Sequence, residues 1–289
     1  MNAPAPVHPP LSQVRAIIRR ALDEDVGWGD VTTDHSVPIE QRSRGVILAK
    51  QAGVLCGGQV FGETLAMVDA AVKVDLLAPD GALVNAGAVV ARVDGPTRAL
   101  LTGERTALNF LQRMSGIATT TAAFVACLRG LPTKLIDTRK TTPGLRVLEK
   151  YAVRVGGGHN HRFNLADAVL LKDNHLAALR SRGQDVAAAI RAIKGRVPHT
   201  MKVEVEVTSV KQIDAVLAGG ADIILLDNMS TEEMRDAVHR IGGRALTECS
   251  GGVTLETVRE RAETGVDLIS SGALTHSAKA LDFSLEIDL

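Results

Sequence analysis

The second half of the chain repeats short apolar runs separated by helix-like segments, and this alternation is the strongest constraint on its fold. The runs have the length and content of strands and comprise residues 134–136, 168–171, 203–207, 223–226, 245–247 and 268–270. Most of the segments between them have helical spacing, as in 185–194, 210–217, 231–241 and 255–263. Strand–helix alternation of this kind implies parallel strands. We therefore predict an α/β barrel, closed or nearly closed.

The first part of the chain has a different pattern. Apolar positions over 11–26 follow helical spacing, and residues 102–128 are again helical. Between them, over 45–93, short β-rich runs are separated by glycine-rich turns. The alternating segment 281–287 predicts a last strand that returns to this region. The predicted domains are an N-terminal α/β sandwich over 1–115, joined by the C-terminal strand 276–289, and an α/β barrel catalytic domain over 116–275.

The composition excludes several classes of protein. The 289 residues carry 33 basic and 33 acidic side chains, and aromatic residues make up only 2%. Without basic tracts or an aromatic stacking platform, nucleic acid is not expected as a partner. No apolar run approaches the roughly 18 residues of a membrane span. The three cysteines are widely separated and form no disulfide framework, so we expect a cytoplasmic protein without a membrane partner.

Cationic side chains gather between residues 137 and 175, although the chain as a whole is neutral. They are Arg139, Lys140, His161, Arg162 and Lys172. Each lies beside a glycine, a proline or the end of an apolar run, where side chains can converge. Arginine and lysine match carboxylate and phosphate oxygens, so the stretch predicts a pocket for a small, multiply anionic ligand. The alternative is that these cations form salt bridges with Asp137, Asp167 and Asp173.

The predicted barrel strands share a second property, because each ends in a polar residue. These residues are Arg139, Lys140, Lys172, Glu206, Asp227, Ser250 and Ser271. Barrel enzymes carry their chemistry at the carboxyl ends of the strands. The pattern therefore predicts that six strands direct functional groups to one mouth. A chance pattern is the alternative, since strands often end in polar residues.

The carboxylates of Glu206 and Asp227 are candidates for the chemistry at this mouth. Glu204 and Glu206 lie two apart on one strand and share a face, and Glu206 is nearer the strand end. Asp227 holds the matching place on the next strand. Such carboxylates can accept hydrogen bonds from ribose hydroxyls, hold hydrated Mg²⁺ or stabilise a developing positive charge. Alternatively, Glu206 pairs with Lys172 or Lys140 for purely structural reasons.

Small residues follow the last two barrel strands. The segments are Glu248-Cys249-Ser250-Gly251-Gly252-Val253 and Ser270-Ser271-Gly272-Ala273-Leu274-Thr275-His276. Glycines after late barrel strands let backbone N–H groups approach a phosphate, which is the usual phosphate position in such barrels. The pair of segments therefore predicts a phosphate site.

Motifs along nearly the whole chain, in the same order, resemble the quinolinate phosphoribosyltransferase family, also called carboxylating nicotinate-nucleotide pyrophosphorylases. The matching segments are 23–25, 29–33, 104–109, 137–141, 160–162, 172–175, 204–206, 226–228 and 250–252. The resemblance implies an N-terminal α/β sandwich joined to an open α/β barrel of the type II phosphoribosyltransferase kind. It also implies a homodimer or higher homo-oligomer that works with Mg²⁺.

The implied reaction transfers phosphoribosyl from phosphoribosyl pyrophosphate to quinolinate. Pyrophosphate and CO₂ are released and nicotinate mononucleotide is formed, a step of de novo NAD biosynthesis. Two alternatives remain open. One is a paralogous phosphoribosyltransferase that uses another heterocyclic acid, and the other is a non-catalytic barrel that binds phosphorylated metabolites.

The resemblance also implies roles for individual residues. The catalytic residues would be Lys140, Glu206 and Asp227, which would also contact phosphoribosyl pyrophosphate, with Glu206 and Asp227 holding the metal through water or substrate. The quinolinate carboxylates would be bound by Arg139, His161, Arg162 and Lys172, with Thr138 beside them and Arg105 contributed by the neighbouring subunit. The 5′-phosphate would lie on Ser250, Gly251, Gly252, Ser271, Gly272 and Ala273.

Overall fold

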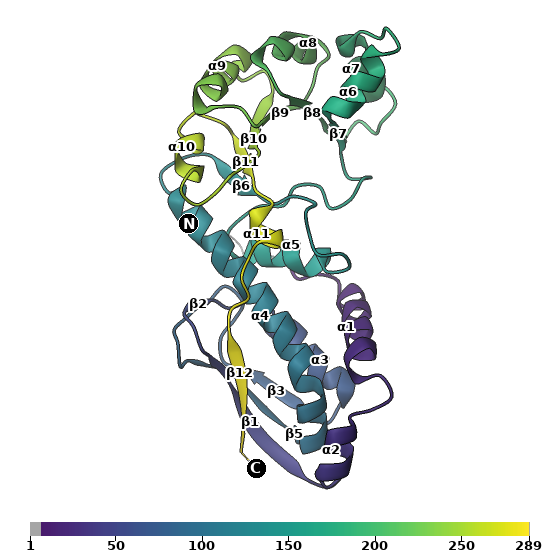
Figure 1. The fold of residues 1–289 in the computed structure, drawn as a ribbon, viewed down its shortest axis with the longest axis vertical. Coiled ribbons are helices and arrows are strands. Elements are labelled where there is room, and N and C mark those ends of the chain that lie inside the picture. Colours follow the sequence, from purple (N-terminus) through teal and green to yellow (C-terminus); the bar gives the residue numbers. More distant parts are fainter. Residues whose placement is uncertain (1–6, 289) are drawn as a thin grey trace. The chain divides into compact units, whose positions relative to one another are not determined.

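The computed structural model describes residues 7–288, apart from the side chain of Arg180, and divides into two compact units (Figure 1). The N-terminal unit comprises the chain up to Ala122, together with Thr141–Gly157 and the chain from Leu274 onward. The barrel unit comprises Ala123–Lys140 and Gly158–Ala273. The predicted domains divided the chain at 115/116 and assigned the whole of 116–275 to the barrel.

The N-terminal unit is built on a four-stranded antiparallel sheet in the order β12-β1-β5-β3. Its strands are β1 (Arg42–Ala49), β3 (Lys73–Leu76), β5 (Val89–Pro96) and β12 (Phe283–Asp288). A separate two-stranded sheet joins β2 (Gly53–Val54) to β4 (Leu83–Val84). Strand β12 lies where the alternating pattern predicted a last strand, and it pairs with β1.

Helices α1 (Leu11–Val26), α2 (Val31–Ser36), α3 (Gly58–Val68) and α4 (Thr97–Cys127) belong to the same part of the chain. The core is built from sheet residues such as Ile47 and from α3 and α4 residues such as Phe61, Leu65, Leu100 and Leu108. Burial of this apolar surface is the main force that holds the helices on the sheet. Helix α4 begins five residues earlier than the helical pattern predicted.

Helix α5 (Arg146–Val155) was not among the predicted elements, and its contacts explain why 141–157 groups with the N-terminal unit. Arg113 of α4 donates to the buried carboxylate of Glu149 at 2.8 Å. Tyr151 donates to Asp80 at 2.9 Å. A Cβ added at Gly156, just beyond the helix, would lie 2.5 Å from the Ala118 carbonyl oxygen, so α4 and the end of α5 approach closely.

The barrel unit contains a six-stranded parallel sheet in the order β6-β11-β10-β9-β8-β7. Its strands are β6 (Lys134–Ile136), β7 (Val169–Leu171), β8 (Val203–Val207), β9 (Ile223–Asp227), β10 (Leu246–Ser250) and β11 (Leu268–Ser270). Each coincides with one predicted apolar run to within a few residues. Strands β6 and β7 stand at the two ends of the order, so the barrel is open.

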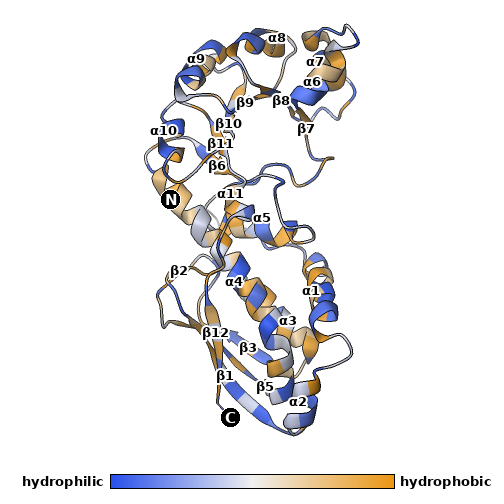
Figure 2. Ribbon diagram, in the orientation of Figure 1, coloured by the Kyte–Doolittle hydropathy of each residue, from blue (hydrophilic) through white to orange (hydrophobic). Residues whose placement is uncertain are grey.

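Helices follow the barrel strands along the chain (Figure 1). They are α6 (Asp173–Arg180), α7 (Val186–Lys194), the 3₁₀ turn η1 (Val210–Gln212), α8 (Ile213–Ala218), α9 (Thr231–Ile241), α10 (Val258–Ala262) and α11 (Ala273–His276). Helix α9 carries both hydrophilic and hydrophobic residues (Figure 2), and it buries Met234, Ala237 and Ile241. None of the helices in the described part of the chain is long and apolar enough to cross a membrane.

Side-chain alternation along the parallel strands separates two environments. Val203, Val205 and Val207 of β8 are fully buried apolar residues. Glu204 and Glu206 alternate with them, and Glu206 lines a cavity at the strand ends. The sequence expectation that the two glutamates share the inward face therefore agrees with the structure.

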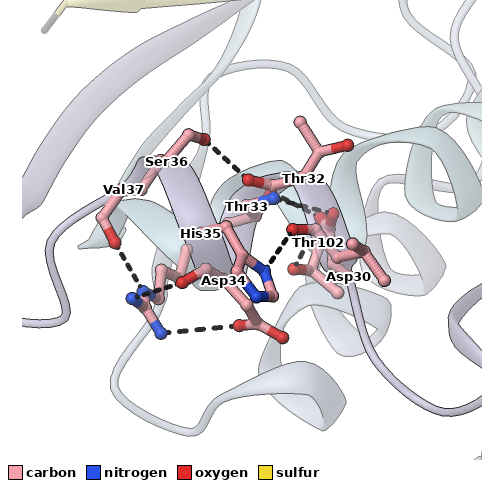
Figure 3. Close-up of polar contacts among 10 residues, drawn as sticks. Asp30, Thr32, Thr33, Asp34, His35, Ser36, Val37 and Thr102 are labelled. Carbon is pink, nitrogen blue, oxygen red and sulfur yellow. Dashed lines mark hydrogen bonds and ion pairs between the residues drawn. The ribbon is translucent and has the colours of Figure 1, made fainter.

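Asp30 fastens α2 to α4 in the N-terminal unit (Figure 3). Its carboxylate caps α2 by accepting from the Thr33 N–H at 3.0 Å, and it also accepts from the Thr102 hydroxyl at 3.2 Å. Hydrogen bonds from the side chain and then the backbone of Thr33 lower the pKa of Asp30. The ionised carboxylate is therefore the form that stabilises this end of the unit.

We expect Asp30→Ala to lower the free energy of unfolding by about 1 kcal/mol at pH 7, because an N-cap is lost. The pKa of Asp30 is lowered in the folded state, so its contribution is complete above the ordinary value of 3.8 and disappears as the pH falls through the folded value. Urea unfolding at pH 7 and pH 3 measures the difference. Exposed Glu40, replaced by Ala, is the charge-matched control. An equal loss at both pH values would contradict the role of the ionised cap.

Candidate active site

A cavity of about 620 Å³ lies at the carboxyl ends of the barrel strands. Each of the six strands contributes to it, either by its last residues or by the residues that follow. The lining comprises Thr138, Arg139, Lys140, His161, Arg162, Leu170, Lys172, Glu206, Leu225, Asp227, Asn228, Glu248, Ser250, Gly251, Gly252 and Ser270. The predicted mouth is therefore a single cavity within one unit.

Most of the residues predicted for the site line this cavity. Among the described residues, the exceptions are Ser271, Gly272 and Ala273, and Arg105 belongs to the N-terminal unit. The last strand contributes Ser270 to the lining. Ser271 is buried, and its hydroxyl donates to the Val253 carbonyl at 3.4 Å.

The loop that carries His161 and Arg162 is fixed to the end of β6 by Asp137. This carboxylate is fully buried and accepts from Asn160 Nδ2 at 2.6 Å and from the His161 N–H at 2.9 Å. His159 adds a parallel bridge to Ile136. The edge of β6 and the buried Asp137 carboxylate therefore hold the loop, so the Arg162 side chain extends from a fixed backbone.

The cations at the mouth lie close enough to influence each other. Burial and then the neighbouring charge of Arg139 lower the pKa of the Arg162 guanidinium. Arginine keeps its proton in proteins, so the two positive charges repel each other across the cavity wall. Arg162 Nη1 also donates to the Ala168 carbonyl at 2.9 Å. An anionic ligand between Arg139 and Arg162 would relieve the repulsion.

Lys172 is positioned by the junction between β7 and α6. Its backbone N–H donates to His175 Nδ1 at 3.0 Å, which forms part of the cap of α6. Its Nζ lies 3.6 Å from Glu206 Oε2, so the ion pair considered as a structural alternative is present. Both partners line the cavity, and Lys172 is half-exposed. Glu206 is largely buried, so a ligand that binds Lys172 has to compete with this carboxylate for the lysine.

The carboxylates of Glu206 and Asp227 come from neighbouring strands. Glu206 is 9% exposed, and Asp227 is half-buried and accepts from Asn228 Nδ2 at 2.8 Å. Carboxylate oxygens of this kind are the ligands that Mg²⁺ prefers. The donor set therefore fits a hard divalent cation.

The loop after β10 needs glycine at its first position. Gly251 has φ 92°, and a Cβ built there would lie 2.1 Å from Asn228 Oδ1. Asn228 itself has φ 52°, and its N–H donates to the Ser250 carbonyl at 3.1 Å. Arg261 Nη1 supports the loop by donating to the Gly251 carbonyl at 2.6 Å. The turns after β9 and β10 thus interlock.

Three polar residues of the site were given no individual role by the sequence, although Glu248 and Ser270 lie in the two segments predicted to bind phosphate. Glu248 and Ser270 line the cavity, and Asp137 holds the loop beneath it. Glu248 had a sequence signal, because it lies two residues before Ser250 and shares its face of the strand. Burying a carboxylate inside a strand costs free energy unless the carboxylate has partners, so the position of Glu248 in an apolar strand indicates a specific role.

An open α/β barrel with cations, paired carboxylates and a glycine turn at its strand ends is the arrangement of an enzyme that acts on phosphorylated, anionic substrates. The protein-family model "Quinolinate phosphoribosyl transferase, N-terminal domain" matches residues 30–115 of the sequence. The family model of the C-terminal domain matches residues 117–286. The chain belongs to the quinolinate phosphoribosyltransferase family.

Individual relatives agree with this assignment. The chain is 42% identical over 277 residues to a probable carboxylating nicotinate-nucleotide pyrophosphorylase of Bacillus subtilis, covering 96% of this chain and 94% of that one. It is 45% identical over 282 residues to the Mycobacterium leprae enzyme of the same name, covering 94% and 96%. The solved structure of NadC from Streptococcus pyogenes is similar at a TM-score of 0.92 and 44% identity, over 98% of this chain and 99% of that one.

We expect Gly251→Ala to lower the free energy of unfolding by about 3 kcal/mol, because it combines a strained φ with a clash against Asn228. Gly130 is the matched control, since it has φ 85° but nothing within 4 Å of an added Cβ. Gly130→Ala should cost about 1 kcal/mol. Chemical denaturation of both variants measures the difference, and equal costs would show that the two turns do not interlock.

Proposed function

We propose that this chain transfers the phosphoribosyl group of phosphoribosyl pyrophosphate to quinolinate, with release of pyrophosphate and CO₂ and formation of nicotinate mononucleotide. This is the decarboxylating pentosyltransferase reaction of NAD biosynthesis, after which the relatives are named. The single observation that carries it is the cavity, which joins a cluster of cations to two carboxylates and a glycine turn. The cations suit quinolinate, and the carboxylates with the glycine turn suit phosphoribosyl pyrophosphate.

The cations suit the acceptor. Quinolinate bears two adjacent carboxylates, and we propose that Arg139, Arg162 and Lys172 bind them, with Thr138 and His161 beside them in the same wall. Planar guanidinium groups match carboxylates in a bidentate manner. Two carboxylates also relieve the repulsion between Arg139 and Arg162, which a single carboxylate would do less completely. The cluster therefore favours a dicarboxylate over a monocarboxylate.

The other side of the cavity suits the donor. We propose that Lys140 neutralises the departing pyrophosphate and that Glu206 and Asp227 stabilise the positive charge that develops on the ribose. Glycosyl transfer passes through an oxocarbenium-like state, so carboxylates aimed at the sugar lower its energy. The 5′-phosphate would bind the N–H groups of the turn at Ser250, Gly251 and Gly252 and those of the segment 271–273.

Magnesium is part of the proposal because the carboxylates of Glu206 and Asp227 are hard oxygen ligands of the kind that this ion takes. When bound, Mg²⁺ would add positive charge beside the pyrophosphate oxygens. Glu206 and Asp227 would hold it through water or through the substrate. Lys140, which follows β6, would neutralise the remaining negative charge of the pyrophosphate.

Decarboxylation follows from the first step. Once its nitrogen carries the ribose, the pyridine ring is cationic, so the electron pair left on the ring carbon by the departing CO₂ is stabilised. The adjacent carboxylate can then leave as CO₂ without a covalent nucleophile, and the ring carbon takes a proton from water in its place. The cations of the cavity would keep the remaining carboxylate in place.

We also propose a homodimer, or a larger assembly of dimers, in which Arg105 completes the site of the neighbouring subunit. Arg105 is exposed on α4, between Thr102 and Thr106. Thr102 donates to Asp30 (Figure 3), and Thr106 donates to Asp25, which fixes the surface around the arginine. Trp28 and Val31, which lie within two residues of Asp30 in the chain, are exposed at 108% and 73%. Large apolar side chains on this surface favour contact with a second copy.

Purified protein supplied with quinolinate, phosphoribosyl pyrophosphate and Mg²⁺ should release CO₂ and nicotinate mononucleotide in equal amounts. Nicotinate offered in place of quinolinate should be used at least about 100-fold less efficiently, because one carboxylate leaves cations unpaired. Chromatography of the nucleotides and trapping of labelled CO₂ measure both. Efficient use of nicotinate would favour the paralogue, and tight binding without turnover would favour a binding protein.

Arg105→Ala and Arg139→Ala should each lose at least about 100-fold in kcat/KM, because each removes a charged contact to an anionic substrate. After mixing and subunit exchange, activity should return to about a quarter of the wild-type value. Half of the dimers would then be hybrids with one intact site of two. Mixing two preparations of the same variant is the control. Complete exchange without recovery would show that the site is not shared.

A further inference from the structure

Three side chains form a buried cluster in the barrel that the proposed reaction does not use directly. His161 Nε2 lies 3.0 Å from Glu204 Oε2 and 3.8 Å from Glu248 Oε2. Glu204 and Glu248 are 2% and 1% exposed, whereas His161 reaches the wall of the substrate cavity. Carboxylates buried so completely require specific partners, and the histidine is the partner of Glu204 Oε2.

The hydrogen bonds of His161 define where its ring proton lies. Nδ1 accepts from the backbone N–H of Arg162 at 2.7 Å, so this nitrogen carries no hydrogen. The hydrogen must therefore be on Nε2, which donates it to Glu204 Oε2. Both ring nitrogens are thus engaged by the protein, and the ring is neutral.

Glu248 favours the same arrangement. Its own burial and then the charge of Glu204 raise the pKa of Glu248. A hydrogen bond joins the two carboxyl groups, and Ser270 supplies another to Glu248. Glu204 Oε2 lies nearer to His161 Nε2 than Glu248 Oε2 does, so Glu204 is the acceptor for the ring hydrogen.

The acceptor nitrogen of His161 matters because it fixes Arg162. The guanidinium of Arg162 is repelled by Arg139 and attracted by the charges of Glu204 and Asp167. Two hydrogen bonds of the same residue also fix its position. These are the backbone bond to His161 Nδ1 and the side-chain bond to the Ala168 carbonyl. If the ring hydrogen moved to Nδ1, two N–H groups would face each other and the backbone bond would be lost.

We propose that Glu204 is a positioning residue: it fixes the tautomer of His161 and, through it, the place of Arg162 in the acceptor part of the cavity. Carboxylates orient histidines in this way where a single ring nitrogen must remain an acceptor. The role rests on the proposed function in one respect, because Arg162 is taken to bind the dicarboxylate. Glu204 therefore governs quinolinate binding, although it need not touch the ligand.

Two variants of Glu204 test this role. In Glu204→Gln the amide oxygen still accepts from His161 and the amide N–H₂ donates to Glu248, whereas Glu204→Leu has a similar size and no acceptor. We expect Glu204→Leu to raise KM for quinolinate about tenfold or more, and Glu204→Gln to remain within about threefold of wild type. KM for phosphoribosyl pyrophosphate should change less than about twofold in both. Equal effects on both substrates would overturn the proposal and indicate a general structural role.

His161→Asn supplies a coupling test, because a side-chain oxygen close to the backbone can still accept from the Arg162 N–H without Glu204. In this background Glu204→Leu should add less than about a twofold rise in KM for quinolinate. Effects of the two substitutions that multiply would show that Glu204 does not act through His161, and would overturn the proposal.

A measurement without turnover separates this proposal from the proposed reaction. In ¹⁵N-histidine-labelled protein, the ring signals of His161, identified by their loss in His161→Asn, should report a bare Nδ1 and a protonated Nε2. Glu204→Gln should keep this pattern and Glu204→Leu should lose it. A hydrogen on Nδ1 in the wild type would overturn the proposal. If the pattern holds but quinolinate is not turned over, the proposed reaction fails and the link between Glu204 and the tautomer stands.

Discussion

The parallel alignment of six strands is the constraint on which the candidate site depends. Strands that share one direction bring their carboxyl ends to one edge, so side chains as distant in sequence as Arg139 and Ser270 line one cavity. The alternation of side chains then decides which of them reach it. Val205 is fully buried and Glu206 lines the cavity, although they are neighbours. A shift of one residue would exchange their environments.

Bringing like charges together at one mouth costs electrostatic energy. Hydrogen bonds to the backbone of the residues that carry these charges hold them in place against the repulsion. Asp137 holds the loop of His161 and Arg162 from below, and the junction of β7 with α6 holds Lys172. The cations are thus in place before a ligand arrives. Binding an anion then relieves repulsion and does not require the cations to be gathered first, which is the advantage of preorganisation.

Local patterns carried much of the prediction. The six apolar runs became the six strands of the barrel, and the polar residues at five of the strand ends line the cavity, because periodicity and turn residues act over short distances. The same patterns missed α5, whose burial depends on α4 and on Asp80. They also selected Ser271 after β11, whereas Ser270 lines the cavity. That difference is one of side-chain direction, which the end of a strand does not reveal in sequence.

The sequence by itself determined the kinds of element, their order around the barrel and the chemical groups available at its mouth, since these follow from side-chain periodicity and residue type. Only the tertiary structure decided how the groups are paired. Asp137 binds backbone and amide groups of its own unit, Lys172 meets Glu206, and His161 is joined to Glu204. Each contact forms only if the distance between two residues far apart in the chain is correct to within a few tenths of an ångström. Hydrogen bonding is sensitive to such distances and residue order is not.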